Sequence, residues 1–294
     1  MQASNSRPAV RHALFAGLVG LAVALCHQAW GIVFDRGLTS DQYSHILLVL
    51  PVSLILLYMQ RAQIFAQAGY SKLAAALLPL IFGAFVVAEH YWPPPSANDF
   101  VSLSLLFFVL WCLASFLLCY GPRAFRTASF PLLFLVLMVP LPDGLLQRAI
   151  TVLQNTSTEA TVLFFSAARV PFTRHGTVIV LPRLSIEVAR ECSSIRSSLI
   201  LFISSFVLAH LYLKRRWQKI ALVLLAIPLS VIKNGLRIFT LSMLGMYVNP
   251  GFLSGNLHHH GGIVFFAIGF AILLAVIWLF RRLEPRQAAS AGRE

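Results

Sequence analysis

One stretch of the sequence concentrates side chains that could carry out nucleophilic chemistry. Cys192 lies within residues 188–198, next to a long apolar run and between Arg190 and Arg196. Positive charge and the backbone N–H groups at the start of a helix both favour the thiolate form of a cysteine. The pattern predicts a nucleophilic thiol at Cys192. The alternative is a cysteine that packs as a small apolar side chain.

Arg237 is a second candidate, because it lies inside a predicted membrane span. Lys233 precedes it by four residues and therefore shares its face of a helix. An ionisable group inside a span is costly and points to a function, and a guanidinium could bind a substrate carboxylate or stabilise an oxyanion. Alternatively, Arg237 extends to the outer interface, or the two cations pair with Glu187 or Glu191.

Three consecutive histidines, His258, His259 and His260, form a third candidate. One imidazole could serve as general acid or base beside a thiol, and His45, at the start of an earlier span, could assist. Glu89 and His90 could contribute from another connector. The histidines could instead lie at the lipid headgroups or bind a metal. However, adjacent histidines point in different directions and no acidic residue lies nearby, so we expect no metal and no cofactor.

The other cysteines and the nearby serines have structural interpretations. The cysteines Cys26, Cys112 and Cys119 lie inside apolar runs, and no pair has the CxxC spacing of a zinc or redox motif. We expect them to pack as small apolar side chains. The four serines around Cys192 are expected to cap the start of the following helix; they are Ser193, Ser194, Ser197 and Ser198.

The composition is that of a membrane protein. The chain has 294 residues, of which 58% are hydrophobic and 11% charged, whereas a soluble domain carries about 25% charged residues. Strand-like alternation is rare, so the spans are expected to be helices. The net charge of +13 is spread over the ends of apolar runs, as the positive-inside rule predicts for cytoplasmic loops. That distribution argues against binding of nucleic acid.

We expect about eight transmembrane helices in a single domain, residues 1–294. They correspond to apolar runs that approach the roughly 20 residues a spanning helix needs: 13–34, 44–59, 73–88, 100–120, 129–141, 194–213, 220–248 and 262–280.

The segment before Cys192 is expected to differ from the spans. Residues 144–168 are amphipathic and predict an interfacial helix, with apolar residues on one side and Gln147, Gln154 and Thr158 on another. Residues 176–181 and 184–189 predict a small β-hairpin. Alternation of basic and non-basic loops places both termini in the cytoplasm. The hairpin, Cys192, the outer end of the 220–248 span and the histidines then share the outer face.

Several motifs, taken together and in order, resemble the exosortase/archaeosortase family over about residues 41–280. They are Tyr43-Ser44-His45, Val139-Pro140-Leu141-Pro142, residues 176–182, Glu191-Cys192-Ser193-Ser194-Ile195-Arg196, Asn234-Gly235-Leu236-Arg237 and His258 with Gly262 and Phe266.

The resemblance implies a multi-spanning cysteine transpeptidase. Cys192 then corresponds to the nucleophile, Arg237 to the family arginine and His258 to the histidine, because the family pattern has a glycine four residues later. A one-residue slip would select His259 or His260. Relative to the family, Ser194 replaces a glycine and Ile263 an aromatic residue. Arg190 stands where an acid is common, and the acid is instead Glu191.

The resemblance also implies the partners and the location. The clients would be exported proteins whose C-termini carry a Pro-Glu-Pro-like motif, an apolar helix and a basic tail. The enzyme would lie in the bacterial inner membrane with its site facing outward, and it could catalyse transpeptidation or hydrolysis. A non-enzymatic membrane component of envelope polysaccharide export or assembly is the main alternative. An intramembrane acyltransferase or a protease of another class is a second alternative.

Overall fold

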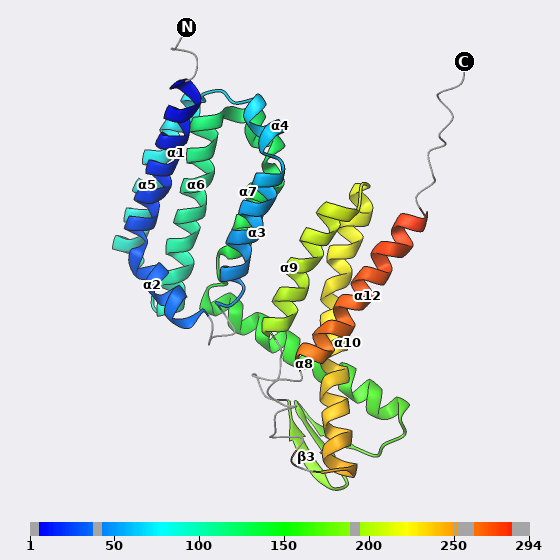
Figure 1. Ribbon diagram of the computed structural model, residues 1–294. Coiled ribbons are helices and arrows are strands. Elements are labelled where there is room, and N and C mark those ends of the chain that lie inside the picture. The colour runs from blue at the N-terminus through cyan, green and yellow to red at the C-terminus, as the bar shows by residue number, and fades with distance from the viewer. Residues whose placement is uncertain (1–5, 38–42, 189–194, 250, 252–261, 284–294) are drawn as a thin grey trace, which may run out of the picture. The chain divides into compact units, whose positions relative to one another are not determined.

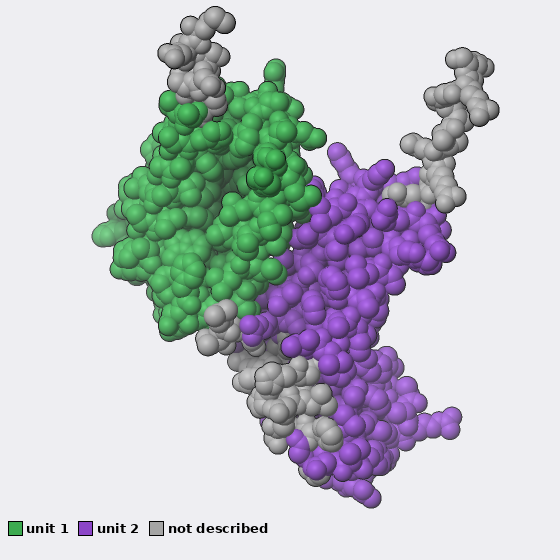
Figure 2. All heavy atoms as spheres, viewed as in Figure 1, with its two compact units in different colours: residues 1–146 green, residues 147–294 purple. Residues whose placement is uncertain are grey.

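The structure is a computed structural model that describes residues 6–37, 43–188, 195–249, 251 and 262–283. The described chain is mostly helical, with one small antiparallel sheet (Figure 1). It forms two compact units, residues 1–146 and 147–294 (Figure 2). Each unit is described by itself below, and a single domain over residues 1–294 stays a prediction.

The first unit consists of helices around one central helix, α6. The helices are α1 (Ser6–Leu25), α2 (His27–Arg36), α3 (Ile46–Met59), α4 (Arg61–Ala66), α5 (Lys72–Tyr91), α6 (Ala97–Thr127), α7 (Ser129–Phe134) and the 3-10 helix η1 (Leu135–Met138). Helix α6 packs against α1, α2, α4 and α5 (Figure 1). Its buried side chains are mostly aliphatic and aromatic, as expected for a helix that other helices surround.

A kink near the end of α6 has a clear cause. Pro122 cannot donate a backbone hydrogen bond within the helix, and Gly121 has a φ of +79°, which glycine adopts without steric cost. The segment before α5 compensates for the break. The Ser71 amide donates to the Leu118 carbonyl at 3.2 Å, and the Gly69 amide donates to the Tyr120 carbonyl at 2.9 Å.

The opposite end of α6 fixes the turn that precedes α8 (Asp143–Ala167). The Asn98 side-chain amide donates to the Leu141 carbonyl at 2.9 Å and to the Asp143 carboxylate at 2.8 Å. Ser102 donates to the Pro140 carbonyl at 2.9 Å, and the Asp99 carboxylate accepts the Asp143 amide at 2.8 Å. The proline-rich turn therefore has its backbone groups satisfied by side chains of one helix start.

The second unit contains three long helices besides the remainder of α8. These are α9 (Ile195–Tyr212), α10 (Arg216–Tyr247) and α12 (Gly262–Leu283), which pack against one another. Their shared core is almost entirely leucine and isoleucine. Where α10 begins and α12 ends, the Gln218 side chain donates to the Phe280 carbonyl at 3.3 Å.

The predicted hairpin is confirmed, and one more strand extends it. Strands β1 (Thr173–His175), β2 (Val178–Leu181) and β3 (Leu184–Glu187) form an antiparallel sheet in the order β1-β2-β3. Strand β2 buries Ile179 and Leu181 against Phe165 of α8 and Met246 of α10. The sheet is thus packed onto the helices on one face.

The expected helical membrane fold is confirmed, although fewer helices meet the length criterion than the eight expected. Five described helices are long and apolar enough to cross a membrane: α5, α6, α9, α10 and α12. Two bent pairs raise the number to seven; in one of them α1 and α2 meet at 73°. The run at 44–59 forms α3, whose 14 residues fall short of the roughly 20 that cross the hydrocarbon.

Candidate functional site

Two of the three predicted site residues, Cys192 and His258, lie outside the described residues, as do His259 and His260. Arg237 lies in α10. The structure does describe the residues on both sides of Cys192, namely Val188 and the start of α9 at Ile195. It therefore shows what holds the chain immediately before and after the proposed nucleophile.

Before Cys192, the backbone of Val188 is held at both of its polar groups. Its amide donates to the Thr177 carbonyl at 3.0 Å, which extends the sheet by one residue. Its carbonyl accepts a hydrogen bond from the Gln154 side chain of α8 at 2.6 Å. Val188 is also 1% exposed. The sheet and α8 together fix the point from which the chain enters the Cys192 segment.

After Cys192, the first turn of α9 is held by α10. The Lys233 ammonium donates to the Ser197 hydroxyl at 2.5 Å, and Lys233 is only 4% exposed. A buried ammonium needs a polar partner because its desolvation is costly. The pairing considered for Lys233 from the sequence was with Glu187, which is exposed on β3, or with Glu191, outside the described residues. Ser197, expected as a helix cap, serves here as an acceptor.

Helices α8 and α10 cross at one close contact of small and polar residues, which we call the α8–α10 seam: Ser157, Ala160, Thr161, Asn234 and Gly235. The Asn234 amide donates to the Ser157 hydroxyl at 3.0 Å. A Cβ placed on Gly235 would lie 2.6 Å from the Ala160 Cβ, so only glycine fits there. The Thr161 hydroxyl contacts the Gly235 carbonyl at 3.4 Å. The seam therefore brings the two backbones close together.

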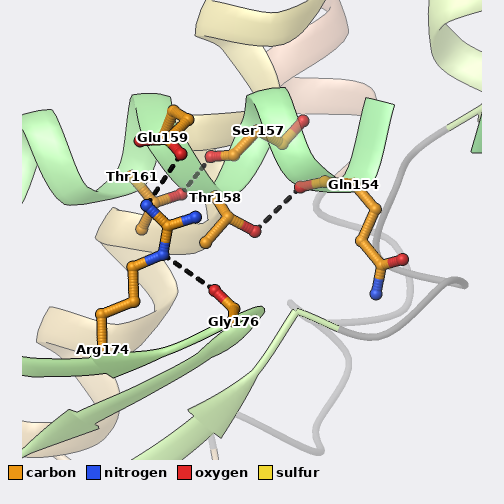
Figure 3. Close-up of polar contacts among 7 residues, drawn as sticks. All are labelled: Gln154, Ser157, Thr158, Glu159, Thr161, Arg174 and Gly176. Carbon is orange, nitrogen blue, oxygen red and sulfur yellow. Dashed lines mark hydrogen bonds and ion pairs between the residues drawn. The ribbon is translucent and has the colours of Figure 1, made fainter. Parts of the chain in front are cut away.

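Three hydroxyl side chains of α8 are buried in the protein. Ser157, Thr158 and Thr161 are each 0% exposed, whereas Val152 and Leu163 are 60% and 68% exposed. Figure 3 shows Gln154, Ser157, Thr158 and Thr161 along consecutive turns of the helix. The sequence predicted the helix, but burial does not follow the predicted sides, because Gln147 of the predicted polar side is exposed whereas Thr158 of that side is buried. Placement of α8 at the membrane interface stays a prediction.

The sheet is also tied to α8 by an ion pair. The Arg174 guanidinium contacts the Glu159 carboxylate at 2.8 Å and donates to the Gly176 carbonyl at 2.8 Å (Figure 3). Gly176 has a φ of +63°, which a tight turn between β1 and β2 requires. Glu159 is 63% exposed, so this pair orients the hairpin more than it stabilises it.

Arg237 lies one helical turn after Lys233 and so on the same face of α10. Its side chain is partly buried and its Nε atom is enclosed. Asn234 and Gly235 lie between these two cations in sequence, so Arg237 follows the point where α10 crosses α8. The predicted arginine is thus carried by a long helix that packs against α9 and α12, and helices place functional groups more precisely than loops do.

The remaining cysteines are confirmed as packed side chains. Cys26, Cys112 and Cys119 are buried and unbridged, which leaves Cys192 as the one cysteine not assigned to a packing role. Among the described residues, no group of three or more His, Cys, Asp or Glu side chains could hold a metal ion. Because the three consecutive histidines lie outside those residues, the expectation of no metal stays a prediction.

The assisting residues suggested by the sequence lie in the first unit. His45 is 5% exposed, next to Tyr43 at 2%, while Glu89 is partly buried and His90 exposed. Burial raises the pKa of Tyr43; Arg36 lowers it, and the nearby carboxylates of Asp143 and Asp99 raise it. Tyr43 and His45 are therefore buried within the first unit, and a part for His45 in chemistry stays a prediction.

Several contacts at the seam were not predicted from the sequence. Gln154, Ser157 and Thr161 resembled the water-facing side of an amphipathic helix, and their partners lie 34 to 77 residues away. One signal was available in Gly235. A glycine inside an apolar helix lowers helix stability, which usually indicates a close packing contact.

Comparison with known proteins identifies one family. The family model described as "Transmembrane exosortase (Exosortase_EpsH)" matches residues 36–275 of this chain. That range covers most of the chain and includes both described units in large part. No match was found among curated proteins or solved structures.

Proposed function

The chain belongs to the transmembrane exosortase family, and on that premise we propose that it is a cysteine peptidase or transpeptidase of C-terminal sorting signals. One observation carries the proposal: the family match over residues 36–275 includes Cys192, Arg237 and His258. The chain is a multi-pass membrane protein. Such an enzyme suits clients that reach it through the membrane.

The proposed reaction divides a difficult acyl transfer into two steps. The Cys192 thiolate attacks the scissile carbonyl, the peptide C–N bond breaks, and a thioester forms. The leaving amine takes a proton from the His258 imidazolium. An acceptor amine or water then attacks the thioester, gives a proton to His258 and releases the thiolate. Arg237 stabilises the negative charge on the carbonyl oxygen or binds an acidic group of the client motif.

The proposed clients are exported proteins with a Pro-Glu-Pro-like motif followed by an apolar helix and a basic tail. The apolar helix would lie beside the spans, and the basic tail would stay on the cytoplasmic side, as the positive-inside rule requires. The site would then face the periplasm of a bacterial inner membrane. An outer-envelope or lipid-linked amine is the proposed acceptor in transpeptidation.

The test is client processing in cells that carry single substitutions. We expect Cys192→Ala, Arg237→Ala and His258→Ala each to lower processing by about a hundredfold or more, the usual scale for removal of an acid–base or nucleophilic group. The matched controls are Cys112→Ala, which removes a packed thiol, and His259→Ala and His260→Ala. Membrane abundance of every variant is measured by immunoblot.

Two outcomes would separate the alternatives. Normal processing by Cys192→Ala would rule out the thiol mechanism, and would leave the polysaccharide-export alternative standing. Loss of function in His258→Ala with a normal Cys192→Ala would instead indicate a histidine-centred acyltransferase. Loss in His259→Ala rather than His258→Ala would move the general acid by one residue.

A further inference from the structure

We propose that Gln154 and Lys233 are positioning residues for the proposed nucleophile. They hold the chain on the two sides of Cys192 and tie both sides to the helix pair that carries Arg237. This inference rests on the proposed function, and its test is designed to fail separately from it.

The first brace is Gln154 to Val188. The Gln154 side-chain amide donates to the Val188 carbonyl at 2.6 Å. The Val188 backbone amide donates to the Thr177 carbonyl in the sheet. Val188 is 1% exposed, so no water competes for its carbonyl. Both backbone polar groups of Val188, the last described residue before Cys192, are therefore hydrogen-bonded. The bond to its carbonyl comes from Gln154 of α8.

The second brace is Lys233 to Ser197, five residues after Cys192. Besides its bond to the hydroxyl, the lysine stem is confined by its neighbours. A Cβ on Gly269 of α12 would lie 3.5 Å from the Lys233 Cδ and 3.4 Å from Leu201 of α9. The ammonium thus reaches the first turn of α9 along a path bounded by α12, and it has little freedom to choose another acceptor.

Both braces originate at the α8–α10 seam. Gln154 lies one turn before Ser157 on α8, and Lys233 directly precedes Asn234 on α10, while Ser157 and Asn234 bond each other at 3.0 Å. At Gly235 the two helices approach so closely that a Cβ would lie 2.6 Å from the Ala160 Cβ, and a close contact of this kind is sensitive to small changes in volume. The two side chains that hold the residues flanking Cys192 therefore both lie next to the point where α8 and α10 cross, and Arg237 follows that point on α10.

This arrangement matters because acyl transfer depends on the relative position of the thiol, the guanidinium and the scissile carbonyl. A displacement of about 1 Å can reduce the rate by about a hundredfold. Loss of either brace should therefore impair the reaction although neither side chain touches the client.

The experiment compares shape-matched substitutions in the full chain. Lys233→Met and Gln154→Leu remove each donor and keep the side-chain volume, Gln154→Glu replaces the donor with a carboxylate that repels the Val188 carbonyl, and Ser197→Ala removes the acceptor. Lys233→Arg retains a donor and is the rescue variant. Exposed residues of the same types supply the controls, Lys214→Met and Gln147→Leu.

Two readouts are made in membranes. The first is client processing per folded protein, with folded protein measured by heat resistance in detergent. The second is the pH dependence of alkylation of Cys192 by a small thiol reagent, in a background that carries Cys26→Ala, Cys112→Ala and Cys119→Ala. A merely structural role would change heat resistance without moving the alkylation profile.

We expect Lys233→Met and Gln154→Leu each to lower processing by at least about tenfold and to shift the alkylation profile. Lys233→Arg should restore part of both, and Lys233→Met combined with Ser197→Ala should be no worse than Lys233→Met alone. Should Lys233→Met fail to fold, Gln154→Glu and Ser197→Ala provide the same comparison.

The inference is overturned if both donors can be removed without a change in processing or alkylation while Cys192→Ala abolishes processing; the proposed function would then survive. It is also overturned if the alkylation profile stays the same and processing falls only in proportion to folded protein. If Cys192→Ala processes clients normally, the proposed function fails. A shifted alkylation profile would then still support the braces as structural determinants of Cys192.

Discussion

A buried charge distinguishes the long helix α10 of the second compact unit from the central helix α6 of the first. In residues 1–146, the buried residues of α6 include no Lys, Arg, Asp or Glu, and the turn before α8 is held by side chains at the helix start. In residues 147–294, α10 buries Lys233 and Asn234 near its middle, both hydrogen-bonded to other helices. Buried polar groups inside membrane helices are costly, so they indicate function.

The contrast suggests a division of labour. The first unit is held mainly by apolar packing. Substitutions there should lower activity only in proportion to the loss of folded protein. The second unit relies on the α8–α10 seam and its braces, and damage there should reduce activity beyond the loss of folded protein. The substitutions below test that contrast in order of expected effect.

The largest stability effect is expected from Gly121→Ala in the first unit. A side chain at a φ of +79° costs about 1–2 kcal/mol, and the new Cβ would lie 2.7 Å from the Gly69 carbonyl oxygen. We expect the free energy of unfolding to fall by about 3 kcal/mol in total, with normal processing per folded molecule. Heat resistance in detergent measures the first quantity.

Gly83→Ala is the matched control for that change. Nothing lies within 4 Å of its new Cβ, and alanine is the better helix former by up to about 1 kcal/mol. A normal heat resistance in Gly121→Ala would show that the kink of α6 is not what holds the first unit together.

Gly235→Ala is expected to have a smaller effect on stability and a larger one on processing. Its Cβ would meet Ala160 at 2.6 Å, and such overpacking costs about 1–3 kcal/mol. The new methyl group would push α8 and α10 apart at the seam. Because this displaces the residues next to the proposed site, processing per folded molecule should fall by about tenfold or more. Gly269→Ala, which makes only ordinary contacts, is the control. Equal losses of folded protein and of processing in Gly235→Ala would remove the contrast between the units.

The smallest effect is expected from Arg174→Ala. Its partner Glu159 is exposed, and ion pairs of that kind contribute less than about 1 kcal/mol. Heat resistance and processing should both stay close to the unchanged protein. A large loss of processing would mean that the orientation of the hairpin, as well as the seam, controls the site.

The sequence predicted the apolar helices well because long apolar runs have few alternatives in a membrane chain. The hairpin also followed from its short β-branched runs around Pro182. The bend at Cys26 was not predicted, since neither proline nor glycine marks it. Strand β1 was missed because Thr173, Arg174 and His175 are polar and form only three residues.

The site was harder to predict than the fold for a physical reason. The motif residues around Cys192 and Arg237 stand out by type and spacing, but their supports do not. Gln154 and Ser157 resemble the exposed side of any amphipathic helix until Val188 and Asn234 supply their partners. Burial of that side is decided by tertiary packing across more than 70 residues, which local periodicity does not encode.

The burial of hydroxyl side chains of α8 has a consequence for the order in which the protein folds during synthesis. Ser157 is synthesised 77 residues before Asn234, an interval of roughly 4–15 s at ordinary translation rates. During that interval the hydroxyl side of α8 has no seam to enter, although the apolar residues on its other side can already associate with lipid. Completion of this half of the molecule must therefore wait for α10.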